Sequence, residues 1–442
     1  MELVDALCSF PEAKSTVELS LAPCFRRGHA SLYAAIADYT WSDVELSHLA
    51  ARYVRRPKQR PFWLLGVDVT PQPRPFARTL TDRGMVYQPN LVKGNKPVTI
   101  GHQYSTTALL PEPEAGISRS WIVPLATQRV TTTADKEMVG GQQVGRLLRD
   151  TALPWYGELV VEVVDSSYSK RPYLCSNRQH PNLVTVCRVA NNRTFWQMAE
   201  PPQGPDPVGH PTWYGDPFCL SDPTTWHTPD ATASTTHISR RGKSYIVQVQ
   251  VWPDMLMRGE REPAILPMHK YPFTLLRIVL SDPVTREPVF SRPLWLIVMG
   301  PRRVEVTPLA TYQAYAQRYN LEHFFRFGKQ KLLLAEFQTP EEEHEEAWWH
   351  LVHLAYLQLW VARHLVNGLP RPWERNLPAM QGRLISPSLV QRDFGRIIRQ
   401  FGTPAQLPKP RGYSAGWQLG RKRKPRERHK VVVKGQLKAN SP

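Results

Sequence analysis

The chain has 442 residues, a formal net charge of +18 and a sequence pI near 9.8. Hydrophobic residues make up 41% of it and aromatic residues 10%, which excludes a mainly disordered chain and gives room for roughly two or three domains. Because so large a positive surplus repels itself, we expect a polyanionic partner, and nucleic acid is favoured over an anionic membrane surface.

The five cysteines are scattered and contain no Cys-x-x-Cys pair, so neither a zinc site nor a disulfide framework is indicated. Cys175 and Cys187, with His180 between them, are the alternative ligand set, and buried thiols are the default interpretation. The first ten residues lack a signal peptide pattern, and the most apolar stretch, 347–366, carries too many polar groups for a lipid span. We therefore expect a cytoplasmic, nucleoid-associated protein without membrane contact.

The first half of the chain predicts a helical start followed by an α/β region. Residues 1–58 indicate helices that are a candidate DNA-binding region, and residues 51–62, "ARYVRRPKQRPF", form a basic linker with two prolines. Apolar runs bounded by turn residues then predict five strands, with one helix among them. The strands are expected at 62–70, 96–110, 118–126, 157–168 and 182–196, and the helix at 134–153. This order predicts a mixed sheet with flanking helices, whose first part spans 60–199.

The second half predicts a block of β structure, then helices, then a basic tail. Residues 200–300 begin with a proline-rich loop and continue with strand patterns over 235–300, and residues 301–370 predict helices. Residues 371–442 are rich in proline, glycine and basic side chains, with nine Lys or Arg and one Glu over 421–438. We expect a mobile arm on DNA phosphates, because the tail has little of the apolar face that a membrane contact needs. Its first candidate DNA contacts are Arg421, Lys422, Arg423 and Lys424.

The stretch "YAQRYNLEHFFRFGKQKLLL", residues 315–334, predicts one helix with a polar stripe. At about 100° per residue, four polar side chains fall within an arc of roughly 60°. They are Tyr315, Arg318, Glu322 and Lys329. The apolar residues Leu321, Phe324, Phe327, Leu332 and Leu334 lie on the other side. A solvated face of ion pairs is the simpler alternative to a functional site.

Three carboxylates are placed where a metal-dependent site would need them. Asp68 and Asp165 each end an apolar strand, and Glu322 lies on the later helix. Three such acids can hold two Mg²⁺ ions, or Mn²⁺ in their place, about 3.5–4 Å apart. That arrangement activates a water or 3′-hydroxyl and stabilises the leaving oxygen of a phosphodiester. Aspartates at strand ends are also common as caps and turn residues, so each acid alone is weak support.

The spacing Tyr315-x2-Arg318-x3-Glu322-x6-Lys329 matches the Tyr–Arg–Glu–Lys signature of bacterial insertion-sequence DDE transposases. The segments "LLGVDVT" and "LVVEVVDSSY" look like the blocks around that group's first and second catalytic aspartates. The chain therefore resembles these enzymes over residues 60–335. The resemblance implies an RNase H-like core, a β-rich insertion domain between the second and third acids, and Asp68, Asp165 and Glu322 as the catalytic, metal-binding triad. One departure is "DSSYSK", which lacks a glycine often found near the tyrosine of this block.

The resemblance implies a Mg²⁺-dependent transposase that cuts double-stranded DNA at element ends and joins 3′-hydroxyls to target DNA. A homodimer is expected on DNA, because two ends are held together. Arg318 and Lys329 would contact phosphates, and Tyr315 would bind a phosphate or a displaced base unless it is a half-buried packing residue. The alternatives are a catalytically silent transposase-derived DNA-binding protein and an RNase H-like nuclease without strand transfer.

Four further residues have both a functional and a core interpretation. Trp226, Trp252 and Trp295 are candidates to receive a flipped base, although most tryptophans belong to a core. His102 follows on the strand expected beside Asp68, where it would approach the metals or serve as a satisfied core histidine. The core interpretation is favoured for all four.

Overall fold

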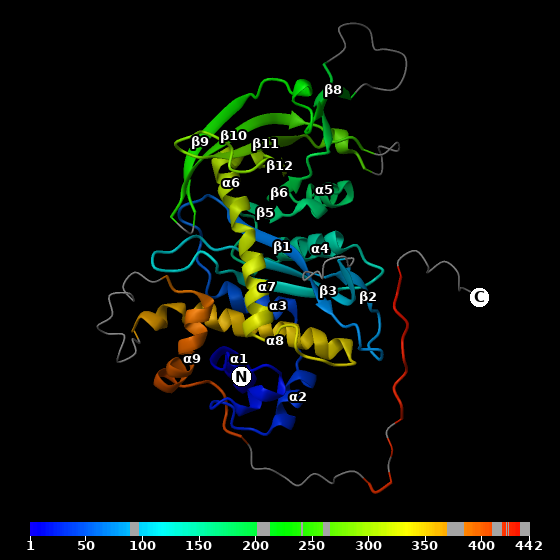
Figure 1. Cartoon of the computed structure of the whole chain (residues 1–442), viewed down its shortest axis with the longest axis vertical. Helices are drawn as coiled ribbons and strands as arrows, with labels where there is room; N and C mark the ends of the chain where they lie inside the picture. The colour runs from blue at the N-terminus through cyan, green and yellow to red at the C-terminus, as the bar shows by residue number, and fades with distance from the viewer. Residues whose placement is uncertain are drawn as a thin grey trace, which may run out of the picture. The chain divides into compact units, whose positions relative to one another are not determined.

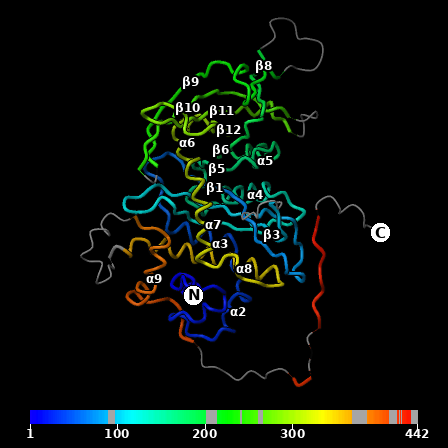
Figure 2. The backbone as a smooth tube through the Cα atoms, viewed as in Figure 1, coloured from blue at the N-terminus to red at the C-terminus, as the bar shows by residue number. Residues whose placement is uncertain are grey.

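The computed structural model describes residues 1–88, 97–200, 213–239, 242–259, 266–368, 384–408, 418–420, 422 and 424–433 (Figure 1). Two candidate DNA contacts of the tail, Arg421 and Arg423, lie outside these residues. The chain forms two compact units. The first unit comprises 1–54, 69–136 and 320–442, and the second comprises 55–68 and 137–319. The backbone tube in Figure 2 shows how the chain passes from one unit to the other several times.

The first unit is built around one buried helix, α8. Its helices are α1 (Glu2–Ser9), α2 (His29–Ala37), α3 (Asp43–Ala51), α7 (Tyr319–Lys331), α8 (Glu342–Val361) and α9 (Pro387–Phe401). Helices α1, α2, α3 and α9 all contact α8. Because α8 is apolar on nearly every side, it is a core helix, as the sequence predicts for 347–366. Among the described residues, no helix has the length and apolarity needed to cross a membrane.

The strands of the first unit are β2 (Gly84–Tyr87), β3 (Val98–Leu109) and β4 (Val123–Val130). Both β2 and β4 pair antiparallel with β3. A charged network is buried beside them, in which His102 Nδ1 lies 2.8 Å from Glu345 Oε1 and Arg74 Nε donates to Glu345 Oε2 at 3.0 Å. The other ring nitrogen of His102 lies 2.9 Å from the carbonyl oxygen of Thr81. The core interpretation of His102 is therefore confirmed.

The second unit holds a mixed sheet in the order β1-β5-β6-β12-β11-β10-β9. The strands β1 (Trp63–Pro73), β5 (Val160–Val164) and β6 (Leu183–Val189) are parallel. Beyond β6 the sheet continues antiparallel through β12 (Leu294–Met299), β11 (Phe273–Ser281), β10 (Ser244–Met255) and β9 (Ala231–Ile238). The expected α/β fold with a mixed sheet and flanking helices is confirmed at this level, with β1 running on into the first unit.

The remaining elements of the second unit are helices and a small sheet. The helices are α4 (Lys136–Arg149), α5 (Arg171–Asn177) and α6 (Pro308–Gln317), and β7 (Thr194–Met198) pairs with β8 (Tyr214–Cys219). Among the described residues, 3₁₀ helices are formed by Val17–Leu21, Ser166–Tyr168, Pro223–Thr225, Met268–Lys270, Arg303–Glu305 and Ala362–Gly368.

The β-rich block over 235–300 belongs to the sheet of the second unit. Its strand β12 pairs directly with β6, so these strands extend the sheet rather than forming a compact unit of their own. Trp252 and Trp295 are each 1% exposed, and the ring centroid of Trp226 lies 5.3 Å from that of Trp295. Trp252 and Trp295 are therefore core residues, as the core interpretation predicts, whereas Trp226 is half-buried and packs against Trp295. The role of the block as an insertion domain stays a prediction.

The single helix expected over 315–334 is wrong in two respects. Helix α6 ends at Gln317 and α7 begins at Tyr319, because the amide of Arg318 bonds to the carbonyl of Tyr315 in a tighter, 3₁₀-like turn. Helix α7 then ends at Lys331, and Leu333 has a positive φ of 55°. The common arc of four polar groups therefore holds only for Glu322 and Lys329. The apolar side is confirmed, since Leu321, Phe324, Phe327, Leu332 and Leu334 are buried.

The C-terminal segment is attached to the first unit rather than free. The amide of His429 donates to the carbonyl of Arg78 at 2.9 Å, and the amide of Val432 donates to the carbonyl of Arg83 at 2.8 Å. The side chain of Arg426 pairs with Glu341 at 2.8 Å. The expectation of a mobile arm is corrected for 426–432, because backbone hydrogen bonds along the β2 side hold this stretch.

Candidate active site

Asp68 lies in β1, and Asp165 directly follows the parallel strand β5 at the matching position. The register of β1 and β5 pairs Gly66 with Val163, and each aspartate comes two residues later. Adjacent strands are about 4.8 Å apart, so both carboxylates project from one small region of the sheet. The local sequence explains the placement, because the "VVEVV" of β5 is fully buried and the chain reaches solvent only at Asp165.

The carboxylate of Asp165 is oriented by the turn that follows β5. It caps the 3₁₀ turn Ser166–Tyr168 by accepting from the amide of Ser167 at 2.8 Å and from its hydroxyl at 2.7 Å. The thiol of the buried Cys187 donates to the carbonyl of Asp165 at 3.2 Å. One oxygen of the carboxylate is thus fixed by its own turn, which limits the directions in which the group can point.

The carboxylate of Asp68 is paired with the arginine of the Tyr–Arg–Glu–Lys signature. Arg318 Nη1 donates to Asp68 Oδ2 at 3.2 Å, and both side chains are mostly buried, with 15% and 17% of their surface exposed. The guanidinium also lies 6.0 Å from the ring centroid of Tyr315. Tyr315 is buried, and its pKa is raised by burial although the charges of Arg318 and Arg188 oppose the rise. Tyr315 thus packs inside the second unit, and a contact with DNA stays a prediction.

Tyr168 lies near both aspartates, and the sequence singles it out only through the departure of its block from the transposase pattern. It is 1% exposed, and its hydroxyl has no hydrogen-bond partner among the described residues. Its pKa is raised well above the usual value, first by burial and then by the negative charges of Asp68 and Asp165. The phenol therefore lies buried and protonated next to both aspartates.

Helix α4 adds a buried carboxylate that sequence reasoning missed. Glu137 is 2% exposed and accepts from Lys170 Nζ at 3.0 Å. A Cβ at Gly140 would lie 2.8 Å from Val67 Cγ1 and 3.3 Å from Tyr168 Cε1, so this glycine permits the close approach of α4. The glycines of "VGGQQVG" are the sequence signal for such close packing, whereas nothing local marks Glu137 as buried.

The remaining predicted site residues belong to the first unit. Lys329 Nζ donates to Thr70 Oγ1 at 2.7 Å and to the carbonyl of Pro71 at 3.1 Å, and burial lowers its pKa to about 8. Glu322 lies in the first turn of α7 and is half-buried. Lys422 and Lys424 are exposed. The convergence of Glu322 with the two aspartates stays a prediction.

The two aspartates have the donor chemistry that Mg²⁺ prefers, since both present carboxylate oxygens. Within the part of the chain that the structure describes, no group of three or more His, Cys, Asp or Glu side chains is close enough to hold an ion. The pair Asp68–Asp165 therefore fits as part of a metal site that needs a further ligand. Arg318 occupies one oxygen of this pair in the structure.

A comparison with protein families gives a match over more than half of the chain. The family model described as "DDE superfamily endonuclease" matches residues 1–248. The chain belongs to this family. Membership makes it a transposase-like nuclease of the kind that acts on DNA with divalent metal ions. A search of curated proteins found no match.

The matched range of this DDE endonuclease covers β1 and β5, and with them Asp68, Asp165 and Tyr168. It ends within β10, so the Tyr–Arg–Glu–Lys signature lies beyond it. The resemblance to insertion-sequence transposases in that later part therefore rests on the spacing of the four residues, and the ion pair between Arg318 and Asp68 adds a physical link between the two parts.

Proposed function

We propose that the protein is the transposase of an insertion sequence, which cuts DNA at the element ends and joins the 3′-hydroxyls to target DNA. The observation that supports this most is the matching position of Asp68 and Asp165 on neighbouring parallel strands, inside the family match. Two carboxylates so placed can share divalent cations at a scissile phosphate. The proposal takes Glu322 as the third acid and a homodimer on DNA as the working form.

The chain's own residues have distinct roles in this proposal. Asp68, Asp165 and Glu322 would hold Mg²⁺, which when bound activates the attacking oxygen and neutralises charge on the phosphate. Asp165 keeps its direction through Ser167, and the buried Tyr168 adds a neutral group near the two aspartates. Arg318, which pairs with Asp68 in the structure, would contact a DNA phosphate when that carboxylate holds a metal ion, and Lys329 would contact a second phosphate.

The test uses the full chain, Mg²⁺ and a DNA duplex that carries the inverted repeats flanking the gene. We expect nicking at the repeat ends and joined product with a target plasmid. Asp68→Asn and Asp165→Asn should each lower cleavage by at least about 10²-fold, because they remove a metal ligand and keep the shape of the side chain. Asp222→Asn is the matched control, since that aspartate is exposed and caps only a surface turn.

The outcomes separate the three candidate functions. Cleavage without joined product would make the protein a nuclease of the same family without strand transfer. Duplex binding without any metal-dependent cleavage would make it a silent DNA-binding protein. Undiminished cleavage by both aspartate variants would contradict the assigned site.

A further inference from the structure

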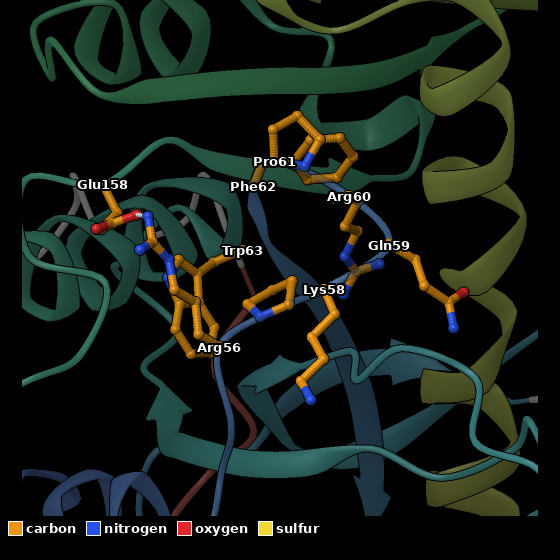
Figure 3. A pocket seen from close by; sticks show the side chains of 9 residues that line it. Arg56, Lys58, Gln59, Arg60, Pro61, Phe62, Trp63 and Glu158 are labelled. Atoms are coloured by element: carbon orange, nitrogen blue, oxygen red, sulfur yellow. Dashed lines mark hydrogen bonds and ion pairs between the residues drawn. The ribbon is translucent and has the colours of Figure 1, made fainter.

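A basic cleft lies at the start of β1, in the linker that precedes the first aspartate. Its volume is about 480 Å³, and all of its lining residues belong to the second unit (Figure 3). They are the residues 56–63 of the linker and the start of β1, together with Glu158. The volume is in the range of ligand sites, and polar and charged side chains form much of its wall.

The charges of this linker cleft are unbalanced. Three cations line it, and Glu158 is the one acid among the nine lining residues. Arg56 Nη2 pairs with this acid, Glu158 Oε2, at 2.7 Å. The pair is exposed, with 74% of the Arg56 side chain accessible, so it holds Arg56 only weakly.

The cations of the linker cleft are held by a stiff frame. Pro57 and Pro61 fix the backbone φ on either side of Lys58 and Arg60. Arg60 Nη1 donates to Gln317 Oε1 at 3.3 Å, and its guanidinium carbon lies 5.5 Å from the ring centroid of Phe62. Positive groups that are ordered in advance lose less entropy when an anion binds.

The frame joins the cleft to the strand that carries Asp68. Phe62 and Trp63 are buried, and the amide of Trp63 donates to the carbonyl of Leu159 at 2.9 Å as β1 begins beside β5. Because Trp63 and Asp68 belong to the same strand, a group bound in the cleft is held at a fixed distance along β1 from the aspartate.

We propose that the linker cleft binds the phosphodiester backbone of DNA, with Lys58 and Arg60 as the phosphate contacts. The inference rests on the proposed function for the identity of the ligand as DNA. Residues 51–62 contain five Lys or Arg and no acid, which favours a polyanion over a single small anion. The cleft would grip a strand outside the site of cleavage, and Arg56 would join it when Glu158 gives way to a phosphate.

The test measures binding of a labelled duplex over a series of salt concentrations, in EDTA, so that cleavage does not enter. The double variant Lys58→Ala, Arg60→Ala should bind about tenfold more weakly or worse. Its slope of log affinity against log salt should be shallower by about 0.9 for each lost contact. Lys243→Ala is the matched control, because Lys243 is an exposed cation of the same unit outside the cleft.

A second variant gives an effect of the opposite sign, which misfolding would not produce. Glu158→Gln removes the acid of the cleft and releases Arg56, so duplex affinity should rise. Inorganic phosphate, titrated alone and as a competitor, distinguishes the two sources of the same chemistry. It should compete only weakly with the duplex, since a single phosphate lacks the neighbouring charges of a strand.

Three results would overturn the assignment of the linker cleft. One is a double variant that binds the duplex with the affinity and salt slope of the parent or of the Lys243 control. Another is weaker duplex binding by Glu158→Gln. The third is tight binding of inorganic phosphate by the parent together with duplex affinity that does not depend on Lys58 and Arg60. By contrast, a parent protein that binds no duplex at all would contradict the proposed function itself.

Discussion

Arg318 donates a hydrogen bond to Asp68 across 3.2 Å. The arginine of the Tyr–Arg–Glu–Lys signature thus neutralises the first of the two aspartates. A divalent ion and this guanidinium compete for the same carboxylate, since both need its oxygens. We therefore propose that the arginine has two partners in turn, the aspartate in the absence of metal and DNA and a phosphate when both are bound. Such an exchange would account for an arginine at this position of the signature.

The exchange predicts opposite effects of one substitution on metal binding and on cleavage. Arg318→Gln should raise the affinity of the DNA-free protein for Mn²⁺, because it removes a positive charge from Asp68, and should lower the rate of DNA cleavage. Calorimetric titration with Mn²⁺ and a cleavage assay measure the two effects. Arg302→Gln is the control, since Arg302 pairs with Glu305 at the surface. Unchanged Mn²⁺ affinity in the Arg318 variant would show that the pair does not control Asp68.

The surroundings of two helix glycines, one in α4 and one in α9, predict that Gly→Ala changes the free energy of unfolding in opposite directions. At Gly140 a new Cβ would meet Val67 at 2.8 Å and Tyr168 at 3.3 Å, and such overpacking costs about 1–3 kcal/mol, more than the gain in helix propensity. At Gly395 in α9 the nearest atom is Ser9 Cβ at 3.9 Å, so Gly395→Ala should stabilise by up to about 1 kcal/mol. Urea unfolding compares them. Equal effects would mean that α4 does not approach β1 as closely as described.

Lys329 predicts a pH dependence of stability. Burial lowers its pKa to about 8, so between pH 8 and the usual lysine value the unfolded chain binds more protons than the folded one. The contribution of Lys329 to the free energy of unfolding should therefore rise with pH across that window. Lys329→Met should flatten the rise, which urea unfolding at several pH values would detect. A parallel pH profile for the variant would place the titration elsewhere.

The attached tail predicts two separate consequences of its removal. A chain that ends at residue 420 should bind any duplex more weakly and with a shallower salt slope, by about 0.9 for each lost phosphate contact. It should also be less stable, because the backbone bonds from His429 and Val432 are lost. Glu341→Gln, which frees Arg426 and also weakens the contact of Glu341 with His344, should leave duplex affinity unchanged or slightly higher. An unaltered salt slope after truncation would remove DNA contact from the functions of the tail.

The sequence predicts most strands of the main sheet because they are apolar runs bounded by turn residues. It misses β2, whose four residues are too few to show a period. It also merges β6 and β7 into one strand over 182–196 and treats the stretch that contains β8 as loop. The break at Arg318 was also hidden, since every residue around it is compatible with a helix. Local patterns place Asp68 and Asp165 at strand ends, whereas the burial of Tyr168 and Glu137 depends on a helix packed across the sheet. Attachment of 426–432 is likewise set by distant residues, Arg78 and Glu341.

The third acid is the least constrained part of the proposed site, and Glu322→Gln tests it. The amide keeps the shape of the side chain but loses the charge that holds a divalent ion, so cleavage should fall by at least about 10²-fold. Duplex binding should survive, because no cation is removed. Lys329→Ala should differ by weakening both cleavage and the hold on end DNA, since it removes a phosphate contact.

Glu336→Gln is the control for this comparison, since Glu336 is exposed in the loop after α7. Cleavage rates and duplex affinities of the three variants would be measured on the same end DNA. If Glu322→Gln cut DNA as well as the parent and the control, Glu322 would be a surface charge of α7. The polar residues of that helix would then be a solvated face, and the third metal ligand would have to come from another carboxylate, with the buried Glu137 beside Tyr168 as the next residue to substitute.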